Sequence, residues 1–223
     1  PSTASQTILQ TNLEGQILQH LCKGTSDAKK LTLSFYVKCT ATGNLQVNLR
    51  DLDNARIIAN TFTINSADTW EFKTITFAGD TSGAFDNDNA SSLRLGFMLG
   101  TGTDYKGGAV PTSWEALSST DKNAGDTLNF SSSASNDFFI TGVQLEVGET
   151  ATDFEHLPHD VQLDRCMRYA YVHNNNADSF QQLLFLGATR GGTNKSFYIQ
   201  HPRPMRDTPS ITLSGEIRMI NIG

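Results

Sequence analysis

Cysteine is scarce in this sequence: only three residues of 223, Cys22, Cys39 and Cys166, are present, and they are far apart. An odd number at such spacing matches neither a disulfide framework nor a set of zinc ligands. Cys39 lies in a strand pattern and Cys166 in a helical one, so both are predicted to be buried free thiols. Unpaired thiols indicate assembly in a reducing compartment.

Charged residues are also few, at 18% of the chain, and the net charge is −6. Lysine and arginine are scattered, and only Lys29 and Lys30 are adjacent. Binding to phosphate backbones needs a basic stripe, so we expect no nucleic-acid partner and attribute the acidic balance to solubility. No apolar run reaches the length of about 20 residues that crosses a bilayer, and no signal-peptide pattern is present, so we expect no membrane insertion.

Motifs of catalysis are missing as well. None of the five histidines stands beside a serine or cysteine in a nucleophile motif, and no repeat that could align paired carboxylates is visible. One cluster combines His156 and His159 with Asp153, Glu155 and Asp160. It could bind a metal, but such a cluster is typical of a solvated turn between domains. We therefore predict a protein that is not an enzyme and has no catalytic residues.

The chain is rich in Ser, Thr, Asn and Gly, which separate short segments of alternating apolar residues. Such alternation is the period of a half-buried strand. It predicts strands at residues 31–38, 45–49, 57–64, 70–77, 93–99 and 138–147. Residues 1–24 lack a clear period and are interpreted as an N-terminal arm or a first strand. Short strands at regular spacing favour an all-β fold, and we predict a jelly-roll β-sandwich over residues 25–155.

A second module is expected after this domain. Ala151–Phe154 and Pro158 mark a boundary, and residues 156–171 are predicted to be a linker with a short helix that Asp160 caps. Residues 172–223 are interpreted as the start of a distal β-domain. Its strands are predicted at residues 183–188, 196–200 and 210–213. The last residues alternate like a strand that continues, so we expect a piece of a longer polypeptide.

Seven segments form a further pattern in this order: Leu31–Lys38, Thr69–Asp80, Asp86–Asn89, Leu93–Gly100, Ile140–His156, Cys166–Tyr169 and His201–Gly215. The pattern resembles the structural proteins of bacteriophage virion appendages, the tail fibres and capsid fibres, over most of the chain. The resemblance implies a jelly roll of the carbohydrate-binding-module type in an appendage that is assembled in the host cytoplasm and becomes part of the virion. It also implies a homotrimer that contacts other virion proteins and host cell-surface glycan. The expected function is host attachment or fibre assembly.

Two other functions stay open. Residues 78–92 and 100–135 form long polar loops with acidic side chains, which would suit a glycan-degrading tailspike enzyme. Such enzymes expose carboxylates on a repetitive β-helix, which this chain does not resemble. The other alternative is a carbohydrate-binding module of a secreted hydrolase.

Sugar binding requires aromatic side chains beside polar groups. The candidates are Tyr36, which lies opposite the apolar face of its strand, and Tyr105 and Trp114, which belong to the loop after residue 100. Trp70 begins a strand, and we expect it in the core or at a hinge. Any ligand contact is expected in the two long loops.

Asp80, Asp86 and Asp88 are weak candidates for a metal, because carboxylate oxygens suit calcium. Their segment lacks the glycine and the distant glutamate of a calcium loop. Jelly rolls of the family that the chain resembles often hold a structural calcium through an aspartate of the last strand, but Ile140–Val143 has none. We therefore expect Asx turns in this loop and no cofactor, with a structural calcium as the weaker alternative.

Leu163, Cys166 and Met167 form the apolar side of the predicted helix, and Arg165 and Arg168 flank them. These residues could pack the two domains against each other. A sharper hypothesis places them near the threefold axis of a trimer, where parallel chains bury their edges against one another.

Overall fold

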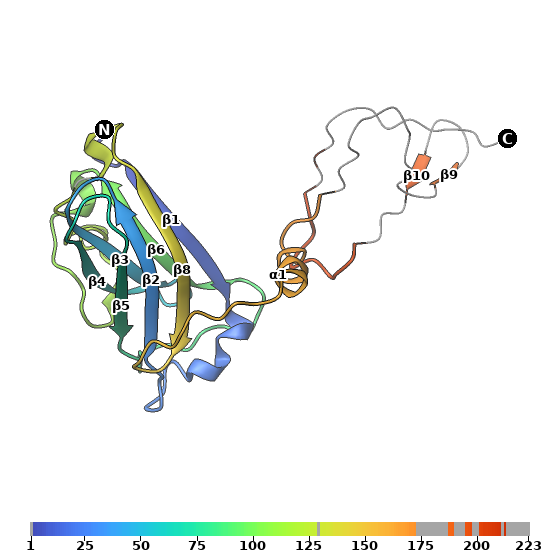
Figure 1. Cartoon of the computed structure of the whole chain (residues 1–223). Helices are drawn as coiled ribbons and strands as arrows, with labels where there is room; N and C mark the ends of the chain where they lie inside the picture. Colours follow the sequence, from blue (N-terminus) through green and yellow to red (C-terminus); the bar gives the residue numbers. More distant parts are fainter. Residues whose placement is uncertain are drawn as a thin grey trace. The chain divides into compact units, whose positions relative to one another are not determined.

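A computed structural model describes residues 2–128, 130–172, 187–189, 195–197, 201–210 and 212. The protein is mostly β and contains two antiparallel sheets that face each other as a β-sandwich (Figure 1). Contacts within the chain divide it into two units, residues 1–155 and 156–223, and the sandwich belongs to the first. The all-β prediction is confirmed at this level.

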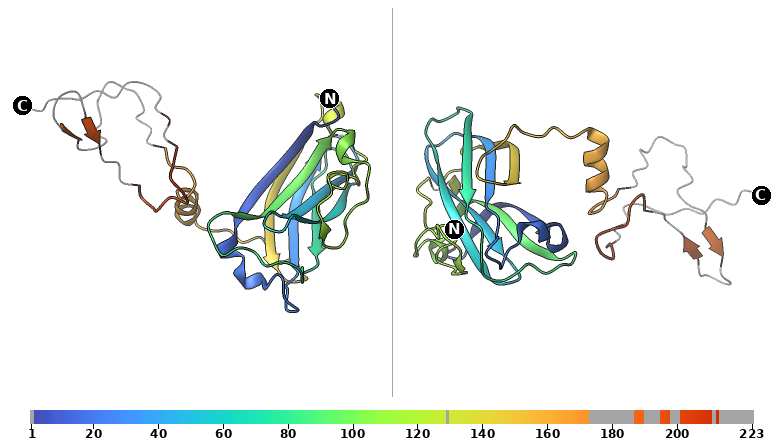
Figure 2. Two further views of the ribbon diagram at one scale, coloured as in Figure 1. Left: turned by 180° about the vertical axis from the view of Figure 1, so that it is seen from behind. Right: turned by 90° about the horizontal axis from the view of Figure 1, so that it is seen from below.

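The larger sheet has five strands in the order β1-β6-β3-β4-β7. Their bounds are β1 (Gln6–Glu14), β6 (Ser91–Thr101), β3 (Gly43–Asp51), β4 (Arg56–Ile64) and β7 (Glu115–Ala116). The smaller sheet has the order β5-β2-β8, with β5 (Glu71–Phe77), β2 (Leu31–Cys39) and β8 (Phe138–Val147). Four short 3-10 helices lie in the connections: η1 (Gly15–Ile17), η2 (Gln19–Leu21), η3 (Thr103–Tyr105) and η4 (Phe130–Ser132). Figure 2 shows the same sandwich from behind and from below.

Alternation along the strands explains the core between the sheets. Leu33, Phe35 and Val37 of β2 are fully buried, because successive side chains of a strand point to opposite faces. The Phe35 ring lies edge-on to the rings of Phe62 and Phe97, with both centroid distances at 5.1 Å. Since Phe62 and Phe97 belong to the larger sheet, these rings join the two layers.

The predicted strands of the sandwich are all observed, with ends that differ by a few residues. For the N-terminal segment, the structure contains a strand and not a separate arm. β1 pairs with β6 from Gln6 to Glu14 and forms one edge of the larger sheet. Its irregular apolar pattern follows from this position, because most of its side chains are exposed.

After β8 the chain turns back over the outer face of the smaller sheet as residues 148–155, which we call the strap. Glu146 accepts hydrogen bonds from the backbone and hydroxyl of Thr152, each at 2.7 Å. Gln144 donates to the hydroxyl of Thr152 at 3.1 Å and accepts from the backbone N–H of Glu155 at 2.9 Å. Gln144 and Glu146 therefore hold the strap in place, and Leu145 between them packs against the core.

The second unit contains α1 (His159–Cys166) and the antiparallel strands β9 (Gly187–Thr189) and β10 (Lys195–Phe197). Pro158 is the N-cap of α1 and no side chain caps the helix, so the cap predicted at Asp160 was wrong. Asp160 lies instead in the first turn, where a carboxylate favours the positive end of the helix dipole. Of the predicted strands in this unit, residues 183–186, 198–200, 211 and 213 lie outside the described residues. Ser210 and Thr212 are in no strand.

No helix among the described residues has both the length and the apolar character needed to cross a membrane.

Candidate binding sites on the two sheet faces

Four exposed aromatic side chains gather on the outer face of the smaller sheet. Tyr36, Trp70, Phe72 and Phe139 are between 44% and 51% exposed. Tyr36 of β2 stands directly opposite Phe72 of β5, and their ring centroids are 4.9 Å apart. Large aromatic side chains that stay exposed together mark an interaction site more often than single ones do.

Lys38 lies between two of these rings. Its Nζ is 5.8 Å from the centroid of Trp70 and 4.6 Å from that of Phe139, which stands directly opposite Lys38 on β8. The ammonium therefore interacts with both ring faces. We refer to Tyr36, Lys38, Trp70, Phe72 and Phe139 as the aromatic surface.

The strap adds Phe154 beside this surface. Gly142 has φ +58°, and a Cβ atom placed there would lie 3.5 Å from the ring of Tyr36 and 3.8 Å from that of Phe154. A β-bulge at this point shifts the register between β2 and β8, and bulges of this kind favour glycine. The other half of the same face is polar, and the strap covers it: Thr32 donates to the carbonyl of Gly148 at 2.8 Å.

Glu71 stabilises the turn that positions Trp70. Its carboxylate accepts from the backbone N–H groups of Asn65 and Ser66 at 2.8 and 2.9 Å and from Lys73 Nζ at 2.6 Å. Burial alone would raise the pKa of Glu71, but these hydrogen bonds and that from the Asn65 amide prevail and lower it from 4.5 to about 2. The charged carboxylate is therefore part of the folded turn.

Replacing Glu71 by Gln is expected to reduce the free energy of unfolding at pH 7 by about 1–2 kcal/mol, because hydrogen bonds to a charged acceptor are lost. A carboxylate whose pKa is lower in the folded than in the unfolded protein stabilises the fold at pH values above its unfolded pKa. That contribution is lost as the pH falls from about 4.5 to about 2. Urea titrations at several pH values should show a shallower acid dependence for Glu71→Gln than for the unchanged chain. An equal acid dependence in both would contradict the assigned role.

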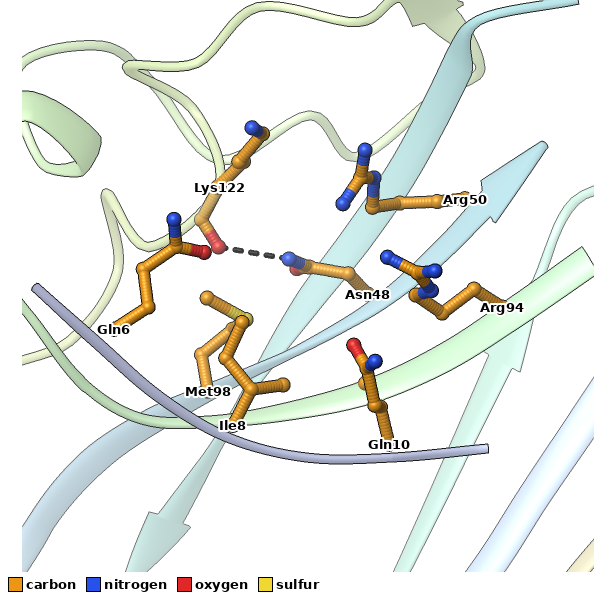
Figure 3. A pocket seen from close by; sticks show the side chains of 9 residues that line it. Gln6, Ile8, Gln10, Asn48, Arg50, Arg94, Met98 and Lys122 are labelled. Carbon is orange, nitrogen blue, oxygen red and sulfur yellow. Dashed lines mark hydrogen bonds between the residues drawn. The ribbon is translucent and has the colours of Figure 1, made fainter. Parts of the chain in front are cut away.

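A pocket lies on the outer face of the larger sheet, on the opposite side of the sandwich. Its floor is formed by β1, β3 and β6, and Lys122 of the long loop after β6 forms a wall (Figure 3). The loop is held to the sheet by two buried amides. Gln46 accepts from the backbone N–H of Gly125 at 2.9 Å, and Asn48 donates to the carbonyl of Lys122 at 2.7 Å. The loop covers one part of the face and leaves the pocket open beside it.

Three cationic side chains line this pocket: Arg50, Arg94 and Lys122. Arg50 of β3 stands directly opposite Arg94 of β6. Burial, and then the charge of Arg94, lower the pKa of Arg50, and the pKa of Lys122 is lowered by burial and by both arginines. We call this site the cationic pocket.

A third polar cluster, at one end of the sandwich, is buried and internally paired. Nζ of Lys23 lies 2.6 Å from Asp51 and 3.1 Å from Asp80, and the three side chains are almost inaccessible. Asp80 also accepts two hydrogen bonds from Arg56. Burial alone would raise the pKa of Asp80, but the hydrogen bonds from Arg56, the backbone of Ser82 and Lys23 lower it.

Two of the residues predicted as site candidates, Asp80 and Trp114, belong to this cluster or pack against it. Asp80 binds Lys23 and Arg56, so its carboxylate already has two cationic partners. Trp114 is not part of an open platform, because its ring packs against the core and on Lys23, and its Nε1 donates to the carbonyl of Ala78 at 2.7 Å.

The remaining loop candidates lie apart from one another. Asp86 and Asp88 are exposed; Asp88 forms the expected Asx turn with the N–H of Ala90. Tyr105 belongs to η3, and its ring lies 5.3 Å from Nζ of Lys122. Among the residues that the structure describes, no three His, Cys, Asp or Glu side chains are arranged to hold a metal ion.

Two expectations of burial were wrong. Of the two places expected for Trp70, the core or a hinge, the core is excluded, because Trp70 is 49% exposed and stands where the outer face of β5 begins, beside Lys38. Cys166 is exposed and only Cys39 is a buried thiol. In α1, Leu163 is 47% exposed, and Met167, its C-cap, is half-buried. The proposed assembly residues therefore leave apolar surface open on this helix.

Sequence reasoning did not find Phe72, Phe139 or the three cations of the pocket. Each of these side chains occupies an outward position of its strand or lies in the long loop. The alternation was a usable signal for Phe72 and Phe139, because an aromatic residue on the polar face of a strand is unusual. No local signal indicates that Arg50 and Arg94 face each other, since the pairing of β3 with β6 sets that contact.

In comparisons with known proteins, no family model, no curated protein and no solved structure matches this chain.

Proposed function

We propose that this protein is a non-enzymatic structural component of a bacteriophage virion appendage, a tail fibre or capsid fibre, that takes part in host attachment. We interpret its β-sandwich as a jelly roll of the carbohydrate-binding type. The observation that best supports the proposal is the aromatic surface, which offers exposed rings on a rigid sheet.

The chemistry of this surface suits host-surface glycan. Aromatic faces stack on the C–H faces of sugar rings, and polar side chains at the rim orient the hydroxyl groups. The rings of Tyr36, Phe72 and Phe139 stand on hydrogen-bonded strands, so little ordering entropy is lost on binding. Each contact of this kind is weak, and an oligomeric fibre compensates through multivalency.

The aromatic surface is tested by the double variant Trp70→Ala/Phe72→Ala. Each lost stacking contact removes about 0.5–1.5 kcal/mol, so we expect binding to isolated host envelope to weaken about tenfold or more. The free energy of unfolding should change by less than about 1 kcal/mol, because both side chains are half exposed. Binding is measured by retention on immobilised envelope glycan.

The matched control is Ile17→Ala, which removes a side chain of similar exposure from η1. Equal binding by the double variant and the control would contradict the proposal. Release of reducing ends from the envelope polysaccharide would instead favour a tailspike enzyme.

The homotrimer is a separate expectation. Static light scattering of the full chain at micromolar concentration should give the mass of three chains. Leu163→Glu should shift the mass toward one chain, because the exposed apolar side of α1 would then present a charge. A stable monomer of the unchanged chain would contradict the trimer.

A further inference from the structure

We infer that the cationic pocket on the larger sheet is a second binding site, specific for the carboxylate or phosphate group of an acidic glycan. It is separate from the aromatic surface, since the two sites lie on the outer faces of different sheets.

The arrangement of charge is the first argument. Arg50 and Arg94 are directly opposite each other on adjacent strands, and like charges in this position are unfavourable. Among the described residues, no Asp or Glu forms an ion pair with Arg50, Arg94 or Lys122. In a chain with net charge −6, three cations without a carboxylate partner are conspicuous. A bound anion would relieve their repulsion.

An unused donor is the second argument. Nε of Arg50 is buried and has no hydrogen-bond partner, whereas Nε of Arg94 donates to Asn12 at 2.9 Å. Buried donors in proteins are nearly always paired, with protein, water or ligand. Guanidinium groups bind carboxylate and phosphate in a two-point geometry. An anionic group in the pocket would supply the acceptor that Arg50 lacks.

The rest of the lining indicates a sugar and not a bare ion. Gln6 and Gln10 bring exposed side-chain amides to the pocket, and Ile8 brings apolar surface (Figure 3). Asn48 and Met98 line its buried floor, where the Asn48 amide is bonded to Lys122 and Gln46. Amides hydrogen-bond sugar hydroxyls, and apolar side chains contact the C–H faces of a ring. A nucleic-acid strand would need a basic groove that continues along the backbone. The acidic glycan is therefore the ligand class that the observations favour.

Two anionic probes separate the sources of the charge. The full chain is titrated calorimetrically with an oligogalacturonate, which offers carboxylates, and with a glycerol phosphate oligomer. A neutral dextran oligosaccharide and a single-stranded oligonucleotide serve as comparisons. We expect one anionic glycan probe to bind, with an affinity that falls as salt rises, and the two comparison probes to bind at least tenfold more weakly. Absence of binding by both anionic probes, or equal binding of dextran or oligonucleotide, would overturn the inference.

Two variants test the residues of the pocket. Arg50→Gln should weaken binding of the preferred probe at least tenfold while the melting temperature of the free protein stays equal or rises, because repulsion of Arg94 disappears. A merely structural arginine would lower the melting temperature. Gly96→Ala keeps every charge and adds a methyl group at ordinary distances of 3.5 and 4.0 Å from Ile8 and Gln10. It should weaken binding by filling the floor.

Lys29→Gln is the matched control, since it removes one charge from an exposed position outside the pocket. Equal loss of binding in Lys29→Gln and Arg50→Gln would overturn the assignment of the site. The Trp70→Ala/Phe72→Ala variant should retain the anionic probe. A chain that binds host envelope through the aromatic surface and neither anionic probe would disprove this inference alone and leave the proposed function standing.

Discussion

Lys23→Met is expected to reduce the free energy of unfolding by about 3–5 kcal/mol, the loss typical of a buried ion pair from which one partner is removed. The Lys23 ammonium lies among four oxygen atoms. They are Asp51 Oδ2 at 2.6 Å, Asp80 Oδ2 at 3.1 Å and the carbonyl oxygens of Ser82 and Gly83 at 2.9 and 2.6 Å. Without the ammonium, Asp80 would keep Arg56, but Asp51 would keep only neutral donors from Asp53 and Asn54.

The measurement is a urea titration of the full chain, with the slope checked for two-state behaviour. Lys30→Met is the matched control, because its ion pair with Glu149 is about half exposed or more on both sides, at 47% and 69%. It should change the free energy of unfolding by less than about 1 kcal/mol. Similar losses in Lys23→Met and Lys30→Met would show that the buried cluster does not stabilise the fold.

The same cluster bears on metal binding. Two carboxylates and two carbonyls surround a single cation position. The cation at that position is the Lys23 ammonium and not a metal ion. Asp80 was a candidate metal ligand in the sequence because its carboxylate could be seen there, whereas its partners Lys23 and Arg56 come from distant segments.

Phe35→Ala should also cost about 3–5 kcal/mol of the free energy of unfolding, from lost burial and from the cavity left between the sheets. The ring is fully buried and lies edge-on to both Phe62 and Phe97. Phe62 and Phe97 stand on hydrogen-bonded strands of the larger sheet, which hold their backbones in place. Relaxation is therefore small, and a value near the upper end of this range is expected.

Phe72→Ala provides the comparison, since it removes the same ring from the outer face of the adjacent strand. It should change the free energy of unfolding by less than about 1 kcal/mol and should weaken binding to host envelope. Comparison of the two variants thus distinguishes a side chain that stabilises the fold from one that binds the ligand. A large stability loss in Phe72→Ala, or a small one in Phe35→Ala, would contradict the roles assigned to the two faces.

The strands could be predicted because alternation is a local property. Leu33, Phe35 and Val37 identify the buried face of β2 without knowledge of any partner, and Tyr36 follows as an outward residue. The failures have the opposite cause. A core position was one of the two places expected for Trp70, and it was wrong because the surroundings of this ring depend on Lys38, which only the sheet brings close.

The sequence by itself determined that this chain is an all-β protein with alternating strands around an apolar core, because the strand period depends on neighbouring residues alone. The tertiary structure decided where chemistry can occur. Strand register placed Arg50 opposite Arg94, and sheet packing buried Lys23 with Asp51 and Asp80. Such contacts join residues that are distant in the chain, and a single sequence contains no signal for the register that brings them together.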